Sequence, residues 1–460
     1  MFWLDRDGQD DNRIFLRELG VSHTFRTVFD DSDRLFRGCD RGVVTILAQR
    51  NYETVVAYVG ALRSGLIPLI VDSELREQDI SDLVEVYRSD YIFGQPCSLL
   101  TKYKIQSSVG NSVLCRANSS SNGSDFSQLG LLLPTSGSTG DPKCVRLSYK
   151  NLDVVTHAIN RYLGLSPGRV SISSLPFHYS YGLSTLNCII DSRSTLVLSS
   201  QSWLEQSFWL LCERECVTDL AGVPFMFQIL ARLNLSKKLL ANLKCVMQAG
   251  GAMSPMLTRV ILDKFAKHDV KFYTMYGQTE AGPRISYVPN EYALIKLGSV
   301  GIPIDIGLVK TDADDGVSAG ELIYHGPNVC LGYAQSREDL AKGDENFGVL
   351  RTGDIAQIDE DGFITIIGRK KRFVKISGAS INLDSIERIG NQIHGEVAVV
   401  GKDDFVLILI QDGNEELCRN QMLDELSIPR RSIQCKKIER LLRLSNGKLD
   451  YMSMTTRYLK

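Results

Sequence analysis

The sequence lacks an excess of charge of either sign, because 52 lysines and arginines accompany 54 aspartates and glutamates and leave a formal net charge of −2 over 460 residues. A near-neutral chain has no global electrostatic field that would indicate nucleic acid or an anionic membrane as a partner. Long hydrophobic runs are also missing, and the first stretch, MFWLDRDGQDDNR, is too acidic and polar for a signal peptide. We therefore expect a cytoplasmic protein with no nucleic-acid partner and no membrane span.

Paired cysteines are missing as well. The eleven cysteines are scattered, no C-x-x-C pair occurs, and the closest two, Cys212 and Cys216, are one helical turn apart. Metal centres and disulfide frameworks need closer or more regular spacing than this. We interpret the cysteines as small buried hydrophobic residues of a protein in a reducing compartment.

Strand and helix patterns alternate over the first 300 residues. After Gly42 come the apolar VVTILAQ, the amphipathic NYETVVAYVGALRS, which ends at Gly65, and the apolar LIPLIVDS. This succession is typical of a β-α-β unit. Further helices are expected at 203–214, 225–233 and 254–267, with short apolar strands between them. Such alternation predicts parallel sheets that are covered by helices on both faces.

The pattern changes past Ser299. Short strands are separated by glycines, and Asp361-Gly362 is expected to form a hairpin turn. The basic stretch GRKKRFVK follows, and then a mixed helical and strand pattern continues to the end. We predict an α/β protein with a large N-terminal domain of parallel α/β sheets plus a β-rich subdomain, and a small α+β C-terminal domain.

The segment PTSGSTGDPK, residues 134–143, combines glycines, hydroxyl residues and a lysine. Glycines let backbone N–H groups close around an anion, while the hydroxyls and the lysine add donors and positive charge. A Walker A loop is excluded, because Gly140 is followed by Asp141 and Pro142. The segment is therefore either a phosphate-binding loop or a flexible linker, and its composition alone favours the linker. The candidate phosphate-binding residues are Thr135, Ser136, Gly137, Ser138, Thr139, Gly140 and Lys143.

Four other stretches occur with this segment, in order: LPFHYSYGL (175–183), MYGQTEAG (275–282), RTGDIAQIDEDGFITIIGRKKRFVKISG (351–378) and LSNGKLDY (444–451). With them the sequence resembles, over essentially its whole length, the adenylate-forming superfamily, which includes acyl- and aryl-CoA ligases, peptide-synthetase adenylation domains and luciferase. The motifs are most similar to those of acyl-CoA ligases. The resemblance implies that 1–369 form an ATP- and acid-binding adenylation domain and that 370–460 form a small mobile domain.

The resemblance also implies a reaction. A carboxylate attacks the α-phosphate of ATP with Mg²⁺ present, giving an acyl-adenylate and pyrophosphate, and a thiol then takes the acyl group. In-line attack at phosphorus needs fixed donors and cations around the developing charge. Residues 135–143 would bind the β- and γ-phosphates, Thr279 the α-phosphate and Glu280 the Mg²⁺. Alone, Glu280 could equally be a charge at a helix N-terminus.

Further residues match nucleotide contacts of the family. The loop QAGGAM, with Gly250, Gly251 and Ala252, matches the segment that packs on adenine. The resemblance implies that Tyr276 and Gly277 belong to the same nucleotide site. The alternative interpretation of the QAGGAM segment is an ordinary strand-to-helix turn.

The small domain and the segment before it carry the rest of the implied site. Asp354 matches the carboxylate that binds the ribose hydroxyls, and Arg369 matches a donor to ribose or phosphate. Lys371 falls at the interdomain hinge, Gly378 along the pantetheine arm, and Lys448 at the catalytic lysine that reaches the site only during adenylation. The KKR run could instead be a solvated charge cluster, and NGK an ordinary exposed turn.

The residue at position 178 narrows the class of carboxylic acid that the protein is expected to activate. Amino-acid-activating relatives have an aspartate here, whereas a neutral or weakly basic imidazole cannot neutralise a buried ammonium. The resemblance suggests that His178 or a neighbouring aromatic residue gates the acyl pocket, with 222–225 in its wall; an aromatic core turn is the alternative. We expect a small carboxylic acid without an amino group as the substrate.

The predicted function is thus that of an acid–thiol ligase, with CoA or the phosphopantetheine of an acyl carrier protein as the thiol. A carrier-protein-loading enzyme of a biosynthetic pathway is the alternative within enzymes. A catalytically inactive binding relative would need to have lost Lys143, Glu280, Asp354 or Lys448, and all four are present.

Overall fold

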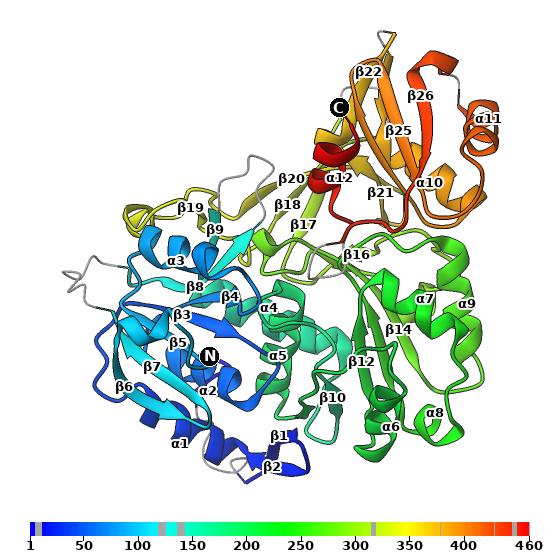
Figure 1. Ribbon diagram of the computed structural model, residues 1–460. Helices are drawn as coiled ribbons and strands as arrows, with labels where there is room; N and C mark the ends of the chain where they lie inside the picture. Colours follow the sequence, from blue (N-terminus) through cyan, green and yellow to red (C-terminus); the bar gives the residue numbers. More distant parts are fainter. Residues whose placement is uncertain are drawn as a thin grey trace. The chain divides into compact units, whose positions relative to one another are not determined.

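The computed structural model describes residues 1–4, 12–117, 126–135, 143–313, 319–377, 379–426, 428–443 and 449–459 (Figure 1). The chain forms two compact units: Met1–Leu308 with His325–Leu350, and Val309–Tyr324 with Arg351–Lys460. The fold class is α/β, as predicted. Within the described ranges, no helix is long and apolar enough to cross a membrane.

The first unit contains an eight-stranded sheet in the order β19-β9-β8-β4-β3-β5-β7-β6. The β-α-β prediction is confirmed, because β3 (Val43–Ala48) pairs in parallel with β4 (Ile67–Asp72) and α2 (Tyr52–Arg63) joins them. The parallel centre also includes β5 (Tyr91–Gly94) and β8 (Leu129–Thr135). Antiparallel strands complete both sides: β6 (Lys104–Val109), β7 (Ser112–Arg116), β9 (Lys143–Ser148) and β19 (Gly332–Ala334).

A nine-stranded sheet, in the order β16-β15-β14-β13-β12-β10-β11-β1-β2, forms the other layer of this unit. Its parallel strands are β1 (Ile14–Glu18), β10 (Val170–Ile172), β11 (Thr195–Val197), β12 (Asp219–Gly222), β13 (Cys245–Gln248) and β14 (Lys271–Tyr276). Short antiparallel strands lie at its ends: β2 (Val21–Thr24), β15 (Ser286–Tyr287) and β16 (Ile302–Pro303).

Helices fill the space between the two sheets and cover their outer faces (Figure 1). The shared core joins β1 and β3 to α1 (Phe25–Leu35), α2, α4 (Tyr149–Leu163) and α5 (Ser180–Ser192). The outer face of the nine-stranded sheet carries α6 (Gln206–Arg214), α7 (Pro224–Arg232), α8 (Lys237–Asn242) and α9 (Pro255–Phe265). α3 (Glu77–Val86) packs on the eight-stranded sheet. The helices predicted near 203–214, 225–233 and 254–267 are therefore present.

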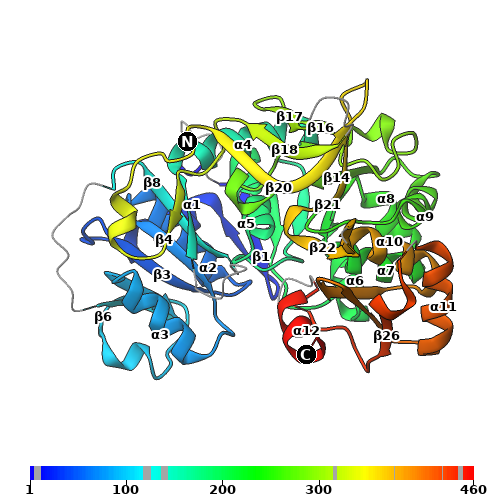
Figure 2. The ribbon, with the colours of Figure 1, turned by 90° about the horizontal axis from the view of Figure 1, so that it is seen from above.

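The second unit begins with an antiparallel hairpin of β20 (Val349–Ile358) and β21 (Ile364–Arg369), in a four-stranded sheet with β17 (Leu308–Asp312) and β18 (Gly320–His325). Gly362 turns this hairpin with φ +83°, as the Asp361-Gly362 pair predicted. β22 (Phe373–Ile376) then pairs with β23 (Ala379–Asn382). A three-stranded sheet of β24 (Val397–Lys402), β25 (Phe405–Ile410) and β26 (Ile433–Lys437) carries α10 (Leu383–His394), α11 (Glu415–Glu425) and α12 (Tyr451–Tyr458) (Figure 2).

The compact units and the boundary expected at residue 369 are different divisions. The β17-β18-β20-β21 sheet clusters with the C-terminal segment, whereas the expected boundary follows this sheet and marks where a moving domain would begin. That functional boundary stays a prediction.

The cysteines follow the expectation with exceptions. All eleven are free and eight are buried, while Cys97 and Cys216 are exposed and Cys39 is half-buried. The prediction of buried thiols is wrong for the two exposed residues: Cys97 lies in an irregular segment and Cys216 in the turn after α6.

Candidate active site

The two ends of the candidate phosphate loop are held together by strand pairing. Thr135 ends β8 and Lys143 begins β9, and the two residues are direct partners across this antiparallel pair. The Thr135 hydroxyl donates to the Lys143 carbonyl at 3.4 Å. Ser136, Gly137, Ser138, Thr139 and Gly140 lie outside the described residues.

Tyr333 connects two of the predicted site residues. The Lys143 ammonium lies 3.7 Å from the centroid of the Tyr333 ring. The Tyr333 hydroxyl donates to Oε1 of Glu280 at 2.7 Å. Burial and the Glu280 carboxylate raise the pKa of Tyr333, so the hydroxyl stays protonated and remains a donor. The structure thus brings Lys143 and Glu280 together around a residue that was not predicted from the sequence.

Arg146 fixes the backbone that carries Tyr333. Its side chain is fully buried and donates to the carbonyls of Leu331 and Tyr333, each at 3.1 Å. It also donates to the carboxylate of Glu345 at 2.5 Å. β19 additionally pairs with β9, with Tyr333 opposite Val145. A charged group buried in this way needs its hydrogen bonds satisfied, and here the backbone satisfies most of them.

Tyr276 ends β14, and the segment after this strand carries Gly277, Thr279 and Glu280. Gly277 has no room for a side chain, because a Cβ there would overlap the Pro283 carbonyl. Thr279 and Glu280 begin a short 3₁₀ turn, Thr279–Ala281. The Thr279 hydroxyl lies 3.0 Å from the hydroxyl of Ser180, the first residue of α5. The predicted α-phosphate contact is therefore in hydrogen-bond contact with α5.

The predicted adenine loop follows β13. Gly250 has φ +86°, and a Cβ there would lie 2.5 Å from the Tyr179 hydroxyl. The Gly251 carbonyl accepts from the Gln248 side chain at 2.9 Å, and Ala252 is exposed. Glycine at 250 is thus required both by the backbone conformation and by the aromatic side chain packed on it. Tyr179 was not singled out from the sequence, although it stands next to His178.

His178 lies beside the end of β4. Its Nε2 is 3.5 Å from Oδ2 of Asp72, and it is buried without a hydrogen-bond partner among the described residues. Burial lowers the pKa of His178, and the carboxylates of Asp72 and Glu74 oppose this effect. The imidazole is therefore neutral at neutral pH, in line with the expectation that it does not bind an ammonium group.

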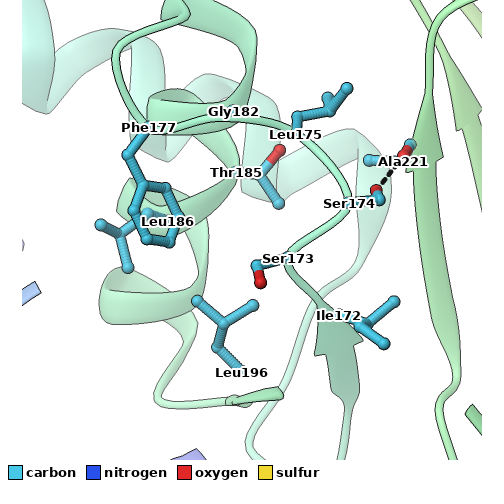
Figure 3. Close-up of a pocket in the computed structure, with 10 residues that line it drawn as sticks. All are labelled: Ile172, Ser173, Ser174, Leu175, Phe177, Gly182, Thr185, Leu186, Leu196 and Ala221. Atoms are coloured by element: carbon cyan, nitrogen blue, oxygen red, sulfur yellow. Dashed lines mark hydrogen bonds between the residues drawn. The ribbon is translucent and has the colours of Figure 1, made fainter. Parts of the chain in front are cut away.

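Residues of α5 and of the segment before it line a narrow cavity (Figure 3). Gly182, Thr185 and Leu186 line the cavity from one face of the helix, and Phe177 lines it from the preceding turn. On the opposite side, the Ser174 hydroxyl donates to the Ala221 carbonyl, which ties the loop after β10 to β12. The cavity is mostly apolar with a few hydroxyls, and it has room for about one water molecule, so an acyl group would enter it only by moving side chains.

Glu280 fits a metal ion that arrives with a nucleotide. Among the residues that the structure describes, no three His, Cys, Asp or Glu side chains form a metal-binding group. A hard cation such as Mg²⁺ needs only one or two protein carboxylates when phosphate oxygens and water supply the other ligands. The Glu280 carboxylate, next to the Thr279 hydroxyl and near the Lys143 ammonium, suits this arrangement.

In the second unit, Asp354 and Arg369 face each other across the β20–β21 pair. Asp354 is 3% exposed, and its Oδ1 lies 3.2 Å from Nε of Arg369. The structure therefore brings the two predicted ribose-binding residues together.

Lys371 lies in the 3₁₀ turn Lys370–Arg372. Its neighbours are paired with acidic groups, Lys370 with Glu321 at 3.0 Å and Arg372 with Glu387 at 3.0 Å. Arg372 is also largely buried, which excludes a solvated charge cluster for that residue. Gly378 and Lys448 lie outside the described residues.

Comparisons with known proteins agree with this geometry. The model of the family described as AMP-binding enzyme matches residues 5–334. The 2-succinylbenzoate–CoA ligase of Listeria innocua is 25% identical over 95% of both chains. That of Bacillus cereus is 30% identical over 59% of this chain and 57% of its own.

Solved structures share the fold. The o-succinylbenzoate CoA synthetase from Bacillus subtilis, in complex with the acyl-adenylate intermediate OSB-AMP, has a TM-score of 0.80 and 20% identity, covering 98% of this chain and 97% of that chain. The same enzyme in complex with ATP and magnesium ion has a TM-score of 0.79 and 20% identity, covering 99% of each chain. The family match covers more than half of the sequence, and the relatives are named as CoA ligases. The chain belongs to the AMP-binding enzyme family and is an AMP-forming acid–thiol ligase, which activates a carboxylic acid as an acyl-adenylate and transfers the acyl group to a thiol.

Proposed function

We propose that this ligase uses MgATP and CoA to convert a small carboxylic acid without an α-amino group into its CoA thioester. The observation that carries the proposal is the Thr279–Ser180 contact of 3.0 Å. It joins the nucleotide motif to α5, whose next turn lines the cavity. An acid bound in that cavity would present its carboxylate at the α-phosphate contact.

Each half-reaction forms one bond to the acyl group or its carboxylate and breaks another. A carboxylate oxygen forms a bond to the α-phosphorus, and pyrophosphate leaves with the electron pair of the broken P–O bond. The thiol sulfur then bonds to the acyl carbon, AMP leaves with the C–O electron pair, and the thiol proton is released. When bound, Mg²⁺ would neutralise part of the charge on the phosphate oxygens.

Different residues of the protein would bind different parts of MgATP. We assign Lys143 and the loop 135–140 to the β- and γ-phosphates, Thr279 to the α-phosphate and Glu280 to the metal ion. Gly250, Gly251, Ala252, Tyr276 and Gly277 would surround the base, and Asp354 with Arg369 would bind the ribose. Preorganised donors of this kind stabilise charge that develops during attack at phosphorus.

The small domain would alternate between the two half-reactions. We assign the catalytic cation to Lys448, the hinge to Lys371 and the pantetheine passage to Gly378, with the moving part beginning at residue 370. A hinge residue absorbs the backbone rotation, so a lysine delivered for adenylation is withdrawn for thioester formation.

Two observations support the proposed class of acid and the choice of CoA as the thiol. His178, whose Nε2 is buried and whose pKa burial lowers, matches the position where amino-acid-activating relatives carry a carboxylate. The relatives are named as 2-succinylbenzoate–CoA ligases, so their names favour CoA and give no support to a carrier protein. A cytoplasmic location remains a prediction from composition.

ATP–pyrophosphate exchange across a panel of carboxylic acids tests the proposal, because exchange requires no thiol. We expect exchange with at least one acid that lacks an α-amino group, followed by CoA thioester formation with that acid. Exchange with a proteinogenic amino acid alone, or transfer to a carrier protein but not to CoA, would contradict the assignment.

A further inference from the structure

Arg284 is a buried arginine with no acidic partner in the part of the chain that the structure describes. It follows the TE motif by four residues, and only 2% of its surface is exposed. Its Nε has no hydrogen-bond partner, and no carboxylate among the described residues forms an ion pair with it. The guanidinium instead lies over the Tyr181 ring, with Cζ 5.1 Å from the ring centroid.

The groups around Arg284 are neutral. Its positive charge acts on four buried or partly buried side chains, whose pKa values burial raises and the guanidinium partly lowers: Tyr162, Tyr179, Tyr181 and Cys188. A buried cation is unfavourable unless it is paired, and contact with one aromatic ring compensates only part of that cost. An anion bound beside Arg284 would therefore offset the remaining cost of burying its charge.

Arg284 also lines a second narrow cavity along α5. Tyr181, Ser184 and Cys188, at helical spacing, form the α5 wall of this cavity, and Met247 of β13 contributes from the sheet. Thr185 lines both this cavity and the one in Figure 3. The space holds about one water molecule, so a ligand would enter by displacing water and moving side chains.

The position of Arg284 is fixed by the nucleotide motif. The side chain of Asn328 donates to the carbonyls of Ala281 and Arg284, at 2.6 and 2.9 Å. The next residue, Ile285, donates its N–H to the Tyr276 carbonyl at 2.9 Å. The backbone that carries Arg284 is therefore tied to the segment that carries Thr279 and Glu280.

We infer that Arg284 binds a second anionic group of the acid substrate, so that the enzyme prefers dicarboxylic acids or acids with an equivalent anion. This inference rests on the proposed function. A guanidinium can bind a carboxylate through two parallel hydrogen bonds. The hydroxyls of Ser184 and Thr185 donate to the Tyr181 carbonyl at 2.8 and 3.1 Å, so they would donate to the same group only after giving up these bonds. One carboxylate would then be activated beside Thr279 while the other is bound at Arg284.

Helix geometry limits the separation of the two groups. Ser180 contacts Thr279, whereas Ser184 and Cys188 line the Arg284 cavity one and two turns further along α5. At about 1.5 Å per residue these positions lie roughly 6 to 12 Å from Ser180 along the helix. Medium-length or aryl-bearing diacids match this separation better than malonate does.

Matched acid pairs test the inference by pyrophosphate exchange. The pairs are succinate with butyrate, adipate with hexanoate, suberate with octanoate, and 2-succinylbenzoate with 3-benzoylpropionate, which lacks the second carboxylate. We expect the wild-type protein to prefer the diacid in at least one pair by 10-fold or more in kcat/KM. Arg284→Met should reduce that preference at least 10-fold, and Arg284→Lys should retain part of it. Arg161→Met, which removes an exposed arginine paired with Asp305, is the matched control and should keep the preference.

Binding of the same acids, measured by calorimetry in the presence of AMP, gives a readout that does not need turnover. It also reports whether Arg284→Met is folded. Monoacids equal to or better than their diacid partners in every pair, in both exchange and binding, would overturn the inference while leaving the proposed function intact. An unchanged preference in folded Arg284→Met would also overturn it. If diacids bind through Arg284 but no acid supports exchange, the anion site stands and the proposed function fails.

Discussion

Replacing Tyr333 by phenylalanine isolates the hydroxyl that connects this residue to Glu280. The variant keeps the ring beside the Lys143 ammonium but removes the 2.7 Å hydrogen bond to the carboxylate. A hydrogen bond to a charged group contributes about 1.5–3 kcal/mol. Tyr333 is 36% exposed, so solvent screening reduces this to about 1–2 kcal/mol.

Without this hydrogen bond, we expect the Glu280 carboxylate to lose its fixed orientation and the affinity for Mg²⁺ to fall. A free-energy loss of about 1–2 kcal/mol corresponds to a roughly 5–30-fold change. We expect pyrophosphate exchange by Tyr333→Phe to fall by that factor at limiting Mg²⁺ and to recover in large part at saturating Mg²⁺. Tyr333→Leu also loses the contact with Lys143, which contributes about 0.5–1 kcal/mol at an exposed site, so its activity should stay lower even at saturating Mg²⁺.

Tyr52→Phe is the matched control, because the Tyr52 hydroxyl donates to the Asp31 carboxylate at 2.6 Å in another part of the first unit. It should lower the free energy of unfolding without changing the Mg²⁺ dependence. A Tyr333→Phe enzyme with wild-type exchange at limiting Mg²⁺ would refute the reasoning, as would an equal shift in Tyr52→Phe.

Three further predictions concern the charged groups of the site. Glu280→Gln should fold normally and lose adenylation at limiting Mg²⁺, because the amide keeps the volume but not the charge; normal exchange there would show that Glu280 is not the ligand. Lys448→Ala should lose roughly 10²–10³-fold in pyrophosphate exchange and keep thioester formation from synthetic acyl-adenylate, whereas Lys371→Pro should show the reverse; equal loss of both steps in Lys448→Ala would contradict alternation of the small domain. Burial holds the pKa of His178 below its ordinary value of 6.5, so the unfolded chain binds the proton first and the free energy of unfolding should fall as pH drops below about 6.5 until the folded pKa is passed. Urea unfolding at pH 7.5 and 5.5 measures this, and His178→Gln should show a smaller fall; an identical fall would exclude His178 as a contributor.

Much of the fold could be predicted because the local patterns agree with the tertiary structure. The apolar VVTILA and LIPLIV become fully paired central strands, and the segment between them forms α2, whose residues are buried almost throughout. The Asp361-Gly362 turn requires a positive φ, which glycine adopts readily. The clustering of β17 and β18 with the C-terminal segment could not be predicted, because it depends on pairing with β20.

The site could be predicted where its chemistry lies in short motifs. Thr279, Glu280 and Asp354 with Arg369 were predicted in this way; the structure gives each of them a defined partner, and their roles stay predictions. Tyr333 and Arg284 have no comparable signal. Tyr333 depends on the pairing of β19 with β9 and on the buried Arg146. Arg284 is distinctive only because it is buried with no acidic partner among the residues that the structure describes.

The transfer of oxygen from acid to nucleotide tests the central claim, acyl-adenylate formation, most directly. An acid that supports exchange is prepared with ¹⁸O at both carboxylate oxygens and incubated with the protein, ATP, Mg²⁺ and CoA. Mass spectrometry then measures the isotope content of AMP and pyrophosphate. The carboxylate oxygen that attacks the α-phosphorus stays on AMP when the thiol takes the acyl group. We predict AMP with a single ¹⁸O atom and unlabelled pyrophosphate. Unlabelled AMP, or ADP with labelled phosphate, would contradict the adenylate mechanism.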